Sequence, residues 1–192
     1  MSDLADHPLR KHIEEITSLS DSDFEYILSH FKYRQLKKHQ YVVQADEYVP
    51  NDFWVISGCL KQFFIDKNGK EHIIQFATSN WWVTDYDAYY NQTKSTFNIH
   101  CMEPCEVLTL SLTNREKLCA DMHKVDHFFR RKSNAGYVAL QKRILSLLTG
   151  TSTERYEKFN KMYPDLINRI PKKYIAAYLG VSRETLSRLY SK

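Results

Sequence analysis

The sequence predicts an α+β chain in which an antiparallel β-barrel lies between short N-terminal helices and a helical C-terminal part. From Tyr33 to about Leu112, short β-branched and aromatic runs alternate with turn signals, a pattern typical of small barrels or sandwiches. After Thr113 the apolar residues recur every three to four positions, and no proline occurs until Pro164. Residues 170–192 place a glycine between two short periodic segments, which indicates two helices joined by a tight turn.

The N-terminal residues 5–31 are expected to form two short helices. Leu9, Ile13 and Ile16 share one helical face, and Asp21 or Ser22 is the expected N-cap of the second helix. The apolar residues of that second helix are Phe24, Ile27, Leu28 and Phe31.

The barrel is expected to contain short strands with turns between them. The candidate strands cover residues 41–44, 53–57, 60–65, 72–77, 96–102 and 106–111. Gly58 marks one turn. Lys67-Asn68-Gly69 marks another and is a strong hairpin signal, because Asn-Gly suits a tight two-residue turn.

The C-terminal segment predicts a helix-turn-helix. Two helices that cross at a tight turn need a small side chain where they touch, which Ala176 supplies. The turn needs a residue that tolerates positive φ, which Gly180 supplies. Pro171 suits a first helical position. The expected apolar seam consists of Ile175, Leu179, Val181, Leu186 and Leu189.

The second of these helices has the features of a DNA-recognition helix. Ser182 is a good N-cap, so Arg183 and Glu184 face outward at the helix start, and Arg188 shares the face of Glu184. Arginine pairs well with guanine, and glutamate accepts from cytosine. The alternative is an ordinary helical hairpin with a solvated charged face.

Residues 182–188, Ser-Arg-Glu-Thr-Leu-Ser-Arg, closely resemble the recognition helix of the Crp/Fnr family of bacterial transcription regulators. The resemblance implies that Arg183, Glu184 and Arg188 contact the operator. The other DNA-binding candidates are Lys172, Lys173, Ser182, Thr185 and Ser187, with phosphate contacts expected from the two lysines, Thr185 and Ser187.

The order of elements is also similar to the Crp/Fnr architecture. It implies a cyclic-nucleotide-binding-like sensor barrel of jelly-roll type over residues 1–122, a long dimerisation helix over 123–150, and a helix-turn-helix domain over 151–192. The helix carries an apolar stripe consistent with a two-fold seam. The stripe consists of Val125, Phe128, Phe129, Ser133, Gly136, Tyr137, Leu140, Ile144, Leu147 and Leu148. The alternative is that it packs only on its own barrel.

The sensor loop departs from family members that bind cyclic AMP. Those relatives use an arginine for the phosphate and a glutamate for the ribose, where this chain has Ser95 and Asp85. A buried phosphate without a cation is costly. No glycine occurs between residues 69 and 136, and the bulky Phe128 and Phe129 replace small hydroxyl residues. Cyclic AMP is therefore not expected as the effector.

A different, less charged effector would need an aromatic pocket. The candidate residues are Trp82, Asp85, Tyr86, Tyr89, Ser95, Phe97, Phe128 and Phe129. The alternative, which the frequency of aromatic cores favours, is that these rings simply fill the barrel.

Charge is distributed unevenly along the chain, whose formal net charge is +4. Residues 151–192 contain nine Lys and Arg against four Asp and Glu, so the positive excess lies with the expected DNA reader. No apolar run is long enough to span a membrane, and the N-terminus lacks a signal-peptide profile. A cytoplasmic protein with reduced cysteines and no metal or other cofactor is expected.

The expected function is that of a dimeric, sequence-specific DNA-binding transcription regulator, not an enzyme. Its expected partners are double-stranded DNA and a second copy of the chain, and RNA polymerase and a small-molecule effector are left open. One alternative is a cupin-like barrel enzyme, for which His72 with Glu71 and His100 with Glu103 are too few ligands. The other is a ligand-free protein that binds DNA constitutively. Because little or no wing is expected before the reading helix, weaker DNA binding with a shallower salt dependence is predicted.

Overall fold

The computed structural model describes residues 4–190, and the chain divides into two compact units. Unit 1 contains residues 1–62 and 76–133, and unit 2 contains residues 63–75 and 134–192. The expected domain bounds stay predictions, and residues 1–3 and 191–192 of the expected domains lie outside the described part. Notably, a short segment from the middle of the chain belongs to the same unit as the C-terminal helices.

The N-terminal segment of unit 1 forms a 3-10 turn η1 (Leu4–Asp6) and the helices α1 (Pro8–Glu14) and α2 (Asp21–Ser29). The two expected helices are confirmed, but the N-cap of α2 is Ser20. Its hydroxyl accepts from Asp23 N at 3.1 Å, and the Asp23 carboxylate accepts from Ser20 N at 3.0 Å. Ser20 takes this role because it is the last residue with extended backbone before the helix.

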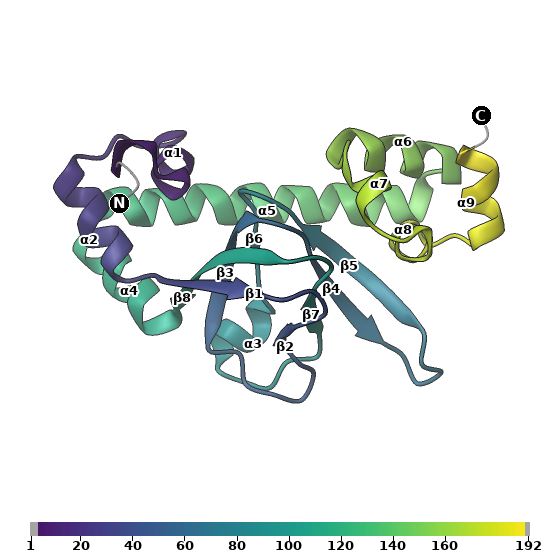
Figure 1. Ribbon diagram of the computed structural model, residues 1–192, viewed down its shortest axis with the longest axis horizontal. Coiled ribbons are helices and arrows are strands. Elements are labelled where there is room, and N and C mark those ends of the chain that lie inside the picture. Colours follow the sequence, from purple (N-terminus) through teal and green to yellow (C-terminus); the bar gives the residue numbers. More distant parts are fainter. Residues whose placement is uncertain (1–3, 191–192) are drawn as a thin grey trace. The chain divides into compact units, whose positions relative to one another are not determined.

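The strands form two four-stranded sheets (Figure 1). The first has the order β1 (Lys32–Leu36), β8 (Cys105–Ser111), β3 (Asn51–Ser57) and β6 (Trp82–Val83). The second has the order β2 (Tyr41–Val43), β7 (Asn98–Cys101), β4 (Leu60–Ile65) and β5 (Glu71–Ala77). The sequence pattern predicted a small barrel or a sandwich, and the two sheets form a β-sandwich whose strands do not close into a barrel.

One edge strand of each sheet is short. The edge strand β6 has two residues, and the edge strand β2 has three with an irregular register between Tyr41 and Val43. Short edge strands of this kind end a sheet without presenting a long row of free backbone groups. Two of these strands were not expected from the sequence. Strand β6 has only two residues, and in the charge-rich strand β1 only Leu36 is buried.

Each strand contributes at least one side chain to a core between the sheets. The buried members include Leu36, Val43, Phe53, Val55, Leu60, Ala77, Val83, Tyr89, Ile99, Cys101 and Val107. Tyr89 comes from the short helix α3 (Tyr86–Asn91), which sequence patterning did not predict.

Two further helices follow the sandwich, α4 (Leu112–Asp121) and the long α5 (His123–Thr149). In unit 1 the first turns of α5 are buried: Val125, Phe128 and Phe129 pack with α1, α2 and the outward side chains Trp54 and Leu108. Beyond residue 133 the large apolar side chains of α5 are exposed. They are Tyr137, Val138, Leu140, Ile144, Leu145, Leu147 and Leu148.

Unit 2 contains the later part of α5 and the helices α6 (Ser152–Met162), α7 (Leu166–Arg169), α8 (Lys172–Leu179) and α9 (Arg183–Tyr190). Three buried rings hold α6 and α8 together: Phe159 lies 5.2 Å from Tyr163 and 5.4 Å from Tyr178 between centroids. Between α6 and α8 the chain forms the short helix α7. No helix of the described residues is long and apolar enough to cross a membrane.

Candidate nucleic-acid interface

The turn between α8 and α9 is built on Gly180, whose φ of 66° lies in the left-handed region, as expected. Val181 N donates to the Ala176 carbonyl at 3.0 Å, so the turn closes the last carbonyls of α8. Ala176 is 3% exposed, and its small side chain lets α9 approach α8 closely. Pro171 is the residue before the first turn of α8, one position earlier than predicted.

The start of α9 is fixed by Ser182. Its hydroxyl oxygen accepts a hydrogen bond from Thr185 N at 3.1 Å, which confirms the expected N-cap. Leu186 is 1% exposed and anchors the inner face of α9. The opposite face is therefore presented outward by a helix that is held at its first residue and along one side.

Three charged side chains occupy the outward face of α9. Arg183, Glu184 and Arg188 are all exposed. The pKa of Glu184 is lowered, chiefly by its own backbone N–H and the Ser182 hydroxyl, with smaller contributions from Arg183 and Arg188. Glu184 is therefore ionised at neutral pH and can accept hydrogen bonds from an amino group of a base.

The other DNA-binding candidates surround this face in the same unit. Lys172 and Lys173 are exposed in the first turn of α8, and Ser187 is exposed on α9. The Lys173 ammonium lies 4.7 Å from the centroid of the Tyr174 ring. Thr185 is half-buried, and its hydroxyl lies 3.1 Å from that of Ser182, so it belongs partly to the cap. The predicted DNA-binding residues thus lie on α8, on the turn and on α9 of one unit.

A hollow of about 590 Å³ adjoins this region inside unit 2. Its wall on one side is the β4–β5 hairpin, through Lys70, Glu71 and His72. On the other side it is lined by α8, the turn and the start of α9, through residues that include Lys173, Tyr174, Gly180, Ser182 and Arg183. Sequence reasoning found the hairpin but not its neighbour, because 100 residues separate the two along the chain and no local signal links them.

Two of the predicted effector residues, Asp85 and Ser95, bind each other. Ser95 Oγ donates to Asp85 Oδ2 at 2.8 Å, and Thr96 N donates to the same oxygen at 3.1 Å. The other carboxylate oxygen caps α3 by accepting from Ala88 N at 3.3 Å. Both Asp85 and Ser95 are buried. Asp85 thus acts as a structural bracket within the loop.

The predicted aromatic effector residues lie in separate places. Trp82, Phe128 and Phe129 meet in the cluster formed with α1 and α2, where the Trp82 and Phe129 centroids are 5.4 Å apart. Tyr89 lies in the sandwich core and donates its hydroxyl to the Leu110 carbonyl at 3.2 Å. Tyr86 is exposed and stacks on Tyr90, and Phe97 is half-buried in the loop before β7.

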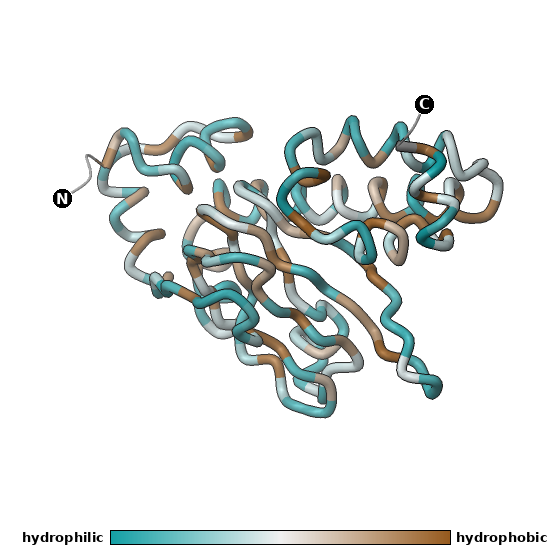
Figure 2. The backbone as a smooth tube through the Cα atoms, turned by 45° about the vertical axis from the view of Figure 1, so that its right-hand side comes forward, coloured by the Kyte–Doolittle hydropathy of each residue, from teal (hydrophilic) through white to brown (hydrophobic). Residues whose placement is uncertain are grey.

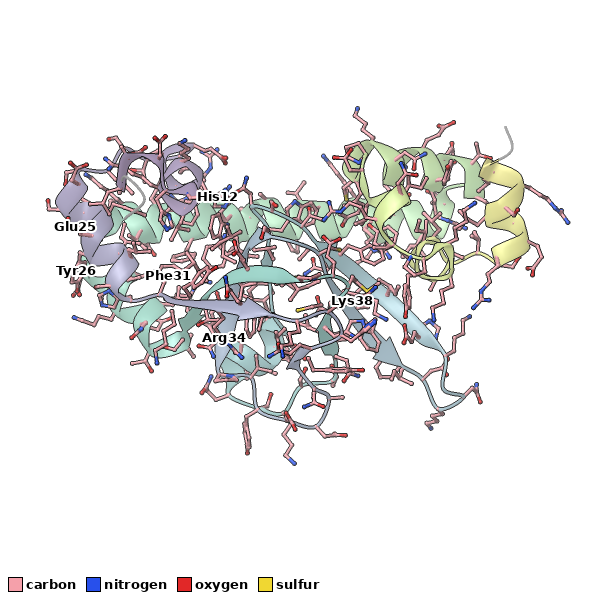
Figure 3. All side chains as sticks on the ribbon, viewed as in Figure 1. His12, Glu25, Tyr26, Phe31, Arg34 and Lys38 are labelled. Atoms are coloured by element: carbon pink, nitrogen blue, oxygen red, sulfur yellow. The ribbon has the colours of Figure 1, made fainter. Side chains whose placement is uncertain are left out.

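His12 of α1, labelled in Figure 3, is a member of this aromatic cluster that sequence reasoning missed. Its Nε2 accepts from Trp82 Nε1 at 3.4 Å, and it is 4% exposed. Burial, followed by the charge of Lys132, lowers its pKa to about 4. The imidazole is therefore neutral at physiological pH.

Asp52 and Arg115 form a buried ion pair that sequence reasoning also missed. Arg115 Nη1 lies 3.1 Å from Asp52 Oδ2, and its guanidinium lies 4.0 Å from the Phe129 ring centroid. Burial raises the pKa of Asp52 to about 7, although Arg115 opposes that rise. Within the described residues, no three His, Cys, Asp or Glu side chains gather as a metal site would require.

Comparison with known proteins places the sandwich in a recognised class. Residues 33–122 match the cyclic nucleotide-binding domain family. No curated protein matches the sequence as a whole. The likeness to solved structures extends further along the chain, into the C-terminal helices.

Three solved regulators share this fold. FixK2 from Bradyrhizobium japonicum has 16% identity over 84% of this chain and 83% of its own, with a TM-score of 0.70. The c-di-GMP responsive global regulator CLP from Xanthomonas campestris has 14% identity over 90% of each chain, with a TM-score of 0.71. The catabolite activator protein from Thermus thermophilus has 18% identity over 90% of this chain and 83% of its own, with a TM-score of 0.55.

Proposed function

We propose that this chain is a sequence-specific DNA-binding transcription regulator of Crp/Fnr type that acts as a homodimer. One observation carries the proposal: α9 buries Leu186 against α8 and presents Arg183, Glu184 and Arg188 outward from a capped N-terminus. Recognition helices enter the major groove with their first turns in this way. The regulators that share the fold support the same reading.

The chemistry of the face matches the edges of base pairs. An arginine guanidinium can donate two hydrogen bonds to guanine O6 and N7, and a carboxylate can accept from cytosine N4. Lys172 and Lys173 in the first turn of α8, together with the hydroxyls of Ser182, Thr185 and Ser187, are suited to phosphate oxygens, which set position and not sequence.

Dimerisation is supported by the exposed apolar side chains of α5 in unit 2. Tyr137, Leu140, Ile144 and Leu148 follow one another at helical spacing, and Leu148 is 78% exposed. A monomer that leaves such a stripe in water exposes a contiguous apolar surface, which marks an association site. A two-fold seam along α5 would bury it and pair two reading helices for a symmetric operator.

The sensor loop supports regulation without cyclic AMP. Ser95 stands where a cyclic-AMP-binding relative has its phosphate arginine, and its hydroxyl is bound to Asp85. Asp85 in turn has its two carboxylate oxygens occupied by Ser95, Thr96 N and Ala88 N. A cyclic phosphate entering here would meet a buried carboxylate and no replacing arginine, which is unfavourable.

Selection of DNA sites from random duplexes with the full-length protein tests the proposal. The expected result is a two-fold symmetric motif with half-sites about one helical turn apart. Saturating cyclic AMP in a parallel selection should leave the motif and the affinity unchanged. Enrichment of no motif would overturn the DNA-reading proposal. A large cyclic-AMP-dependent gain in affinity would overturn the proposal for the sensor loop alone.

A further inference from the structure

The β4–β5 hairpin of unit 2 ends in a tight turn that presents cations outward. Gly69 N donates to the Asp66 carbonyl at 2.9 Å, and Asp66 N donates to the Lys70 carbonyl at 3.0 Å. The Asp66 carboxylate accepts from Asn68 N and Lys70 N and lies 2.7 Å from His72 Nε2. The Asp66 carboxylate is thus hydrogen-bonded within the turn, whereas Lys67 and Lys70 are exposed at a hydrophilic tip (Figure 2).

The same hairpin is fastened to the first helix of the DNA reader by Arg143 of α5. Arg143 Nη2 donates to the Ile73 carbonyl of β5 at 3.1 Å and to the Tyr178 carbonyl of α8 at 3.0 Å. Tyr178 lies in the last turn of α8, where carbonyls lack partners within the helix. One guanidinium therefore fixes the position of the hairpin relative to α8 within the unit.

The hollow between hairpin and reader has a predominantly positive lining. Lys70 faces it from the hairpin, and Lys173 and Arg183 from the reader, against the single acid Glu71. Lys173 and Arg183 are themselves among the residues proposed to contact DNA. A duplex backbone that follows the start of α9 would therefore run beside the hairpin cations.

Among the described residues, those after β8 form helices and no β-hairpin that could contact the duplex backbone. Within residues 4–190, no strand follows β8, which ends at Ser111. A reader without a wing forms fewer phosphate contacts and releases fewer counterions on binding. The hairpin from residues 63–75 occupies the same compact unit and can supply the missing contacts.

We propose that the β4–β5 hairpin is the wing of this DNA reader, with Lys67 and Lys70 contacting backbone phosphates of the duplex whose groove α9 enters. This inference rests on the proposed function, and it assigns the DNA interface to residues from the middle of the chain as well as from its C-terminal part. It also replaces the weak salt dependence expected from the sequence with a steeper one.

The test is a salt titration of full-length protein on its selected site, comparing the wild type with the Lys67→Gln/Lys70→Gln double variant. Each lost phosphate contact lowers the slope of log affinity against log salt by about 1, so the double variant should lose about 2. Its base preference should not change, because phosphates carry no sequence information. Lys94→Gln, which removes an exposed lysine of unit 1, is the matched control and should keep the wild-type slope.

The outcomes separate the two proposals. A wild-type protein that binds its symmetric site, with an unchanged slope in the double variant, would overturn the wing and leave the DNA reader in place. Tighter binding by the double variant would also overturn the wing, because it would mean that the hairpin obstructs the reader. A wild type that selects no site would overturn the proposed function itself. If both variants have the same thermal unfolding midpoint as the wild type, the substitutions leave the fold unchanged.

Discussion

The guanidinium of Arg143 lies 3.6 Å above the centroid of the Tyr178 ring and also hydrogen-bonds the carbonyl oxygen of the same residue. Tyr178 packs at the same time against Phe159 and Tyr163. The cation thus connects α5 to the aromatic cluster of unit 2, and its hydrogen bond to the Ile73 carbonyl adds the β4–β5 hairpin.

Replacing Arg143 should therefore destabilise the fold. Arg143→Met keeps the aliphatic stem but loses two charge-assisted hydrogen bonds and the ring contact, and we expect the free energy of unfolding to fall by about 2–3 kcal/mol. Arg143→Lys should recover only part of this, because an ammonium lacks the planar fork. Urea unfolding measures the effect. A loss below about 0.5 kcal/mol in Arg143→Met, within the range of ordinary surface changes, would contradict it.

Alanine substitutions at two glycines, one in the turn before α9 and one inside α5, give a second prediction. Gly180→Ala should lower the free energy of unfolding by about 1–2 kcal/mol, because φ at this position is 66° although there is room for a Cβ. Gly136→Ala places the same methyl group in the middle of α5, where no atom outside the helix's own backbone and the chain neighbours lies within 4 Å. That change should stabilise the helix of the monomer by about 0.5–1 kcal/mol. A Gly180→Ala variant that is as stable as the wild type in urea unfolding would refute the assignment of the turn.

The parts of the structure that the sequence predicted are those determined by neighbours along the chain. Gly180 needs positive φ whatever lies around it, Ser182 caps the amide three residues on, and Asn68-Gly69 closes its own hairpin. The two N-terminal helices and most strands follow from periodicity in the same way.

The parts that the sequence did not predict depend on partners far along the chain. Closure of the barrel depends on whether short edge strands pair, which periodicity does not encode. Arg115 looks like a solvated charge on α4 until the fold brings it to Asp52. Arg143 likewise has no local sign of its role. The hairpin beside the DNA reader could be recognised as a hairpin only, since its neighbour is set by tertiary packing.

The apolar stripe of α5 predicts that charged side chains introduced into it will weaken the proposed dimer. Leu140→Glu/Ile144→Glu should raise the dimer dissociation constant by at least about 100-fold, because two-fold symmetry places each change in the seam twice. Analytical ultracentrifugation measures it. Lys142→Glu is the control, since two residues along a helix is about half a turn and Lys142 lies on the far side from Ile144. A dimer that survives the double change would exclude α5 as the seam.

The burial of His12 predicts that the free energy of unfolding depends on pH. Its pKa is about 4 in the folded chain, against 6.5 when unfolded, so only the unfolded state gains the proton between these values. Its stabilising contribution is present above pH 6.5 and is lost as the pH falls toward 4, by about 3 kcal/mol in total. Protonation of Nε2 also removes the acceptor of Trp82 Nε1.

The neutral variant His12→Gln isolates this effect from other titrating groups, such as Glu15 and Lys132 beside it. The difference in unfolding free energy between wild type and variant should shrink by about 3 kcal/mol from pH 7 to pH 4. Chemical denaturation at a series of pH values gives this difference directly. A difference that stays constant across the range would mean that His12 is accessible to protons in the folded state.

Arg183 and Lys172 lie on neighbouring helices of unit 2. Changing each to alanine should affect DNA binding in a different way. Arg183 faces outward at the first residue of α9, so its loss should lower discrimination at one base step by about 1–3 kcal/mol. Lys172 begins α8, and its loss should weaken binding uniformly across sequences and reduce the salt slope by about 1. Binding of both variants to all single-base variants of the selected site distinguishes the roles. An unchanged base preference in Arg183→Ala would place its guanidinium on the phosphates and leave Glu184 and Arg188 as the readers.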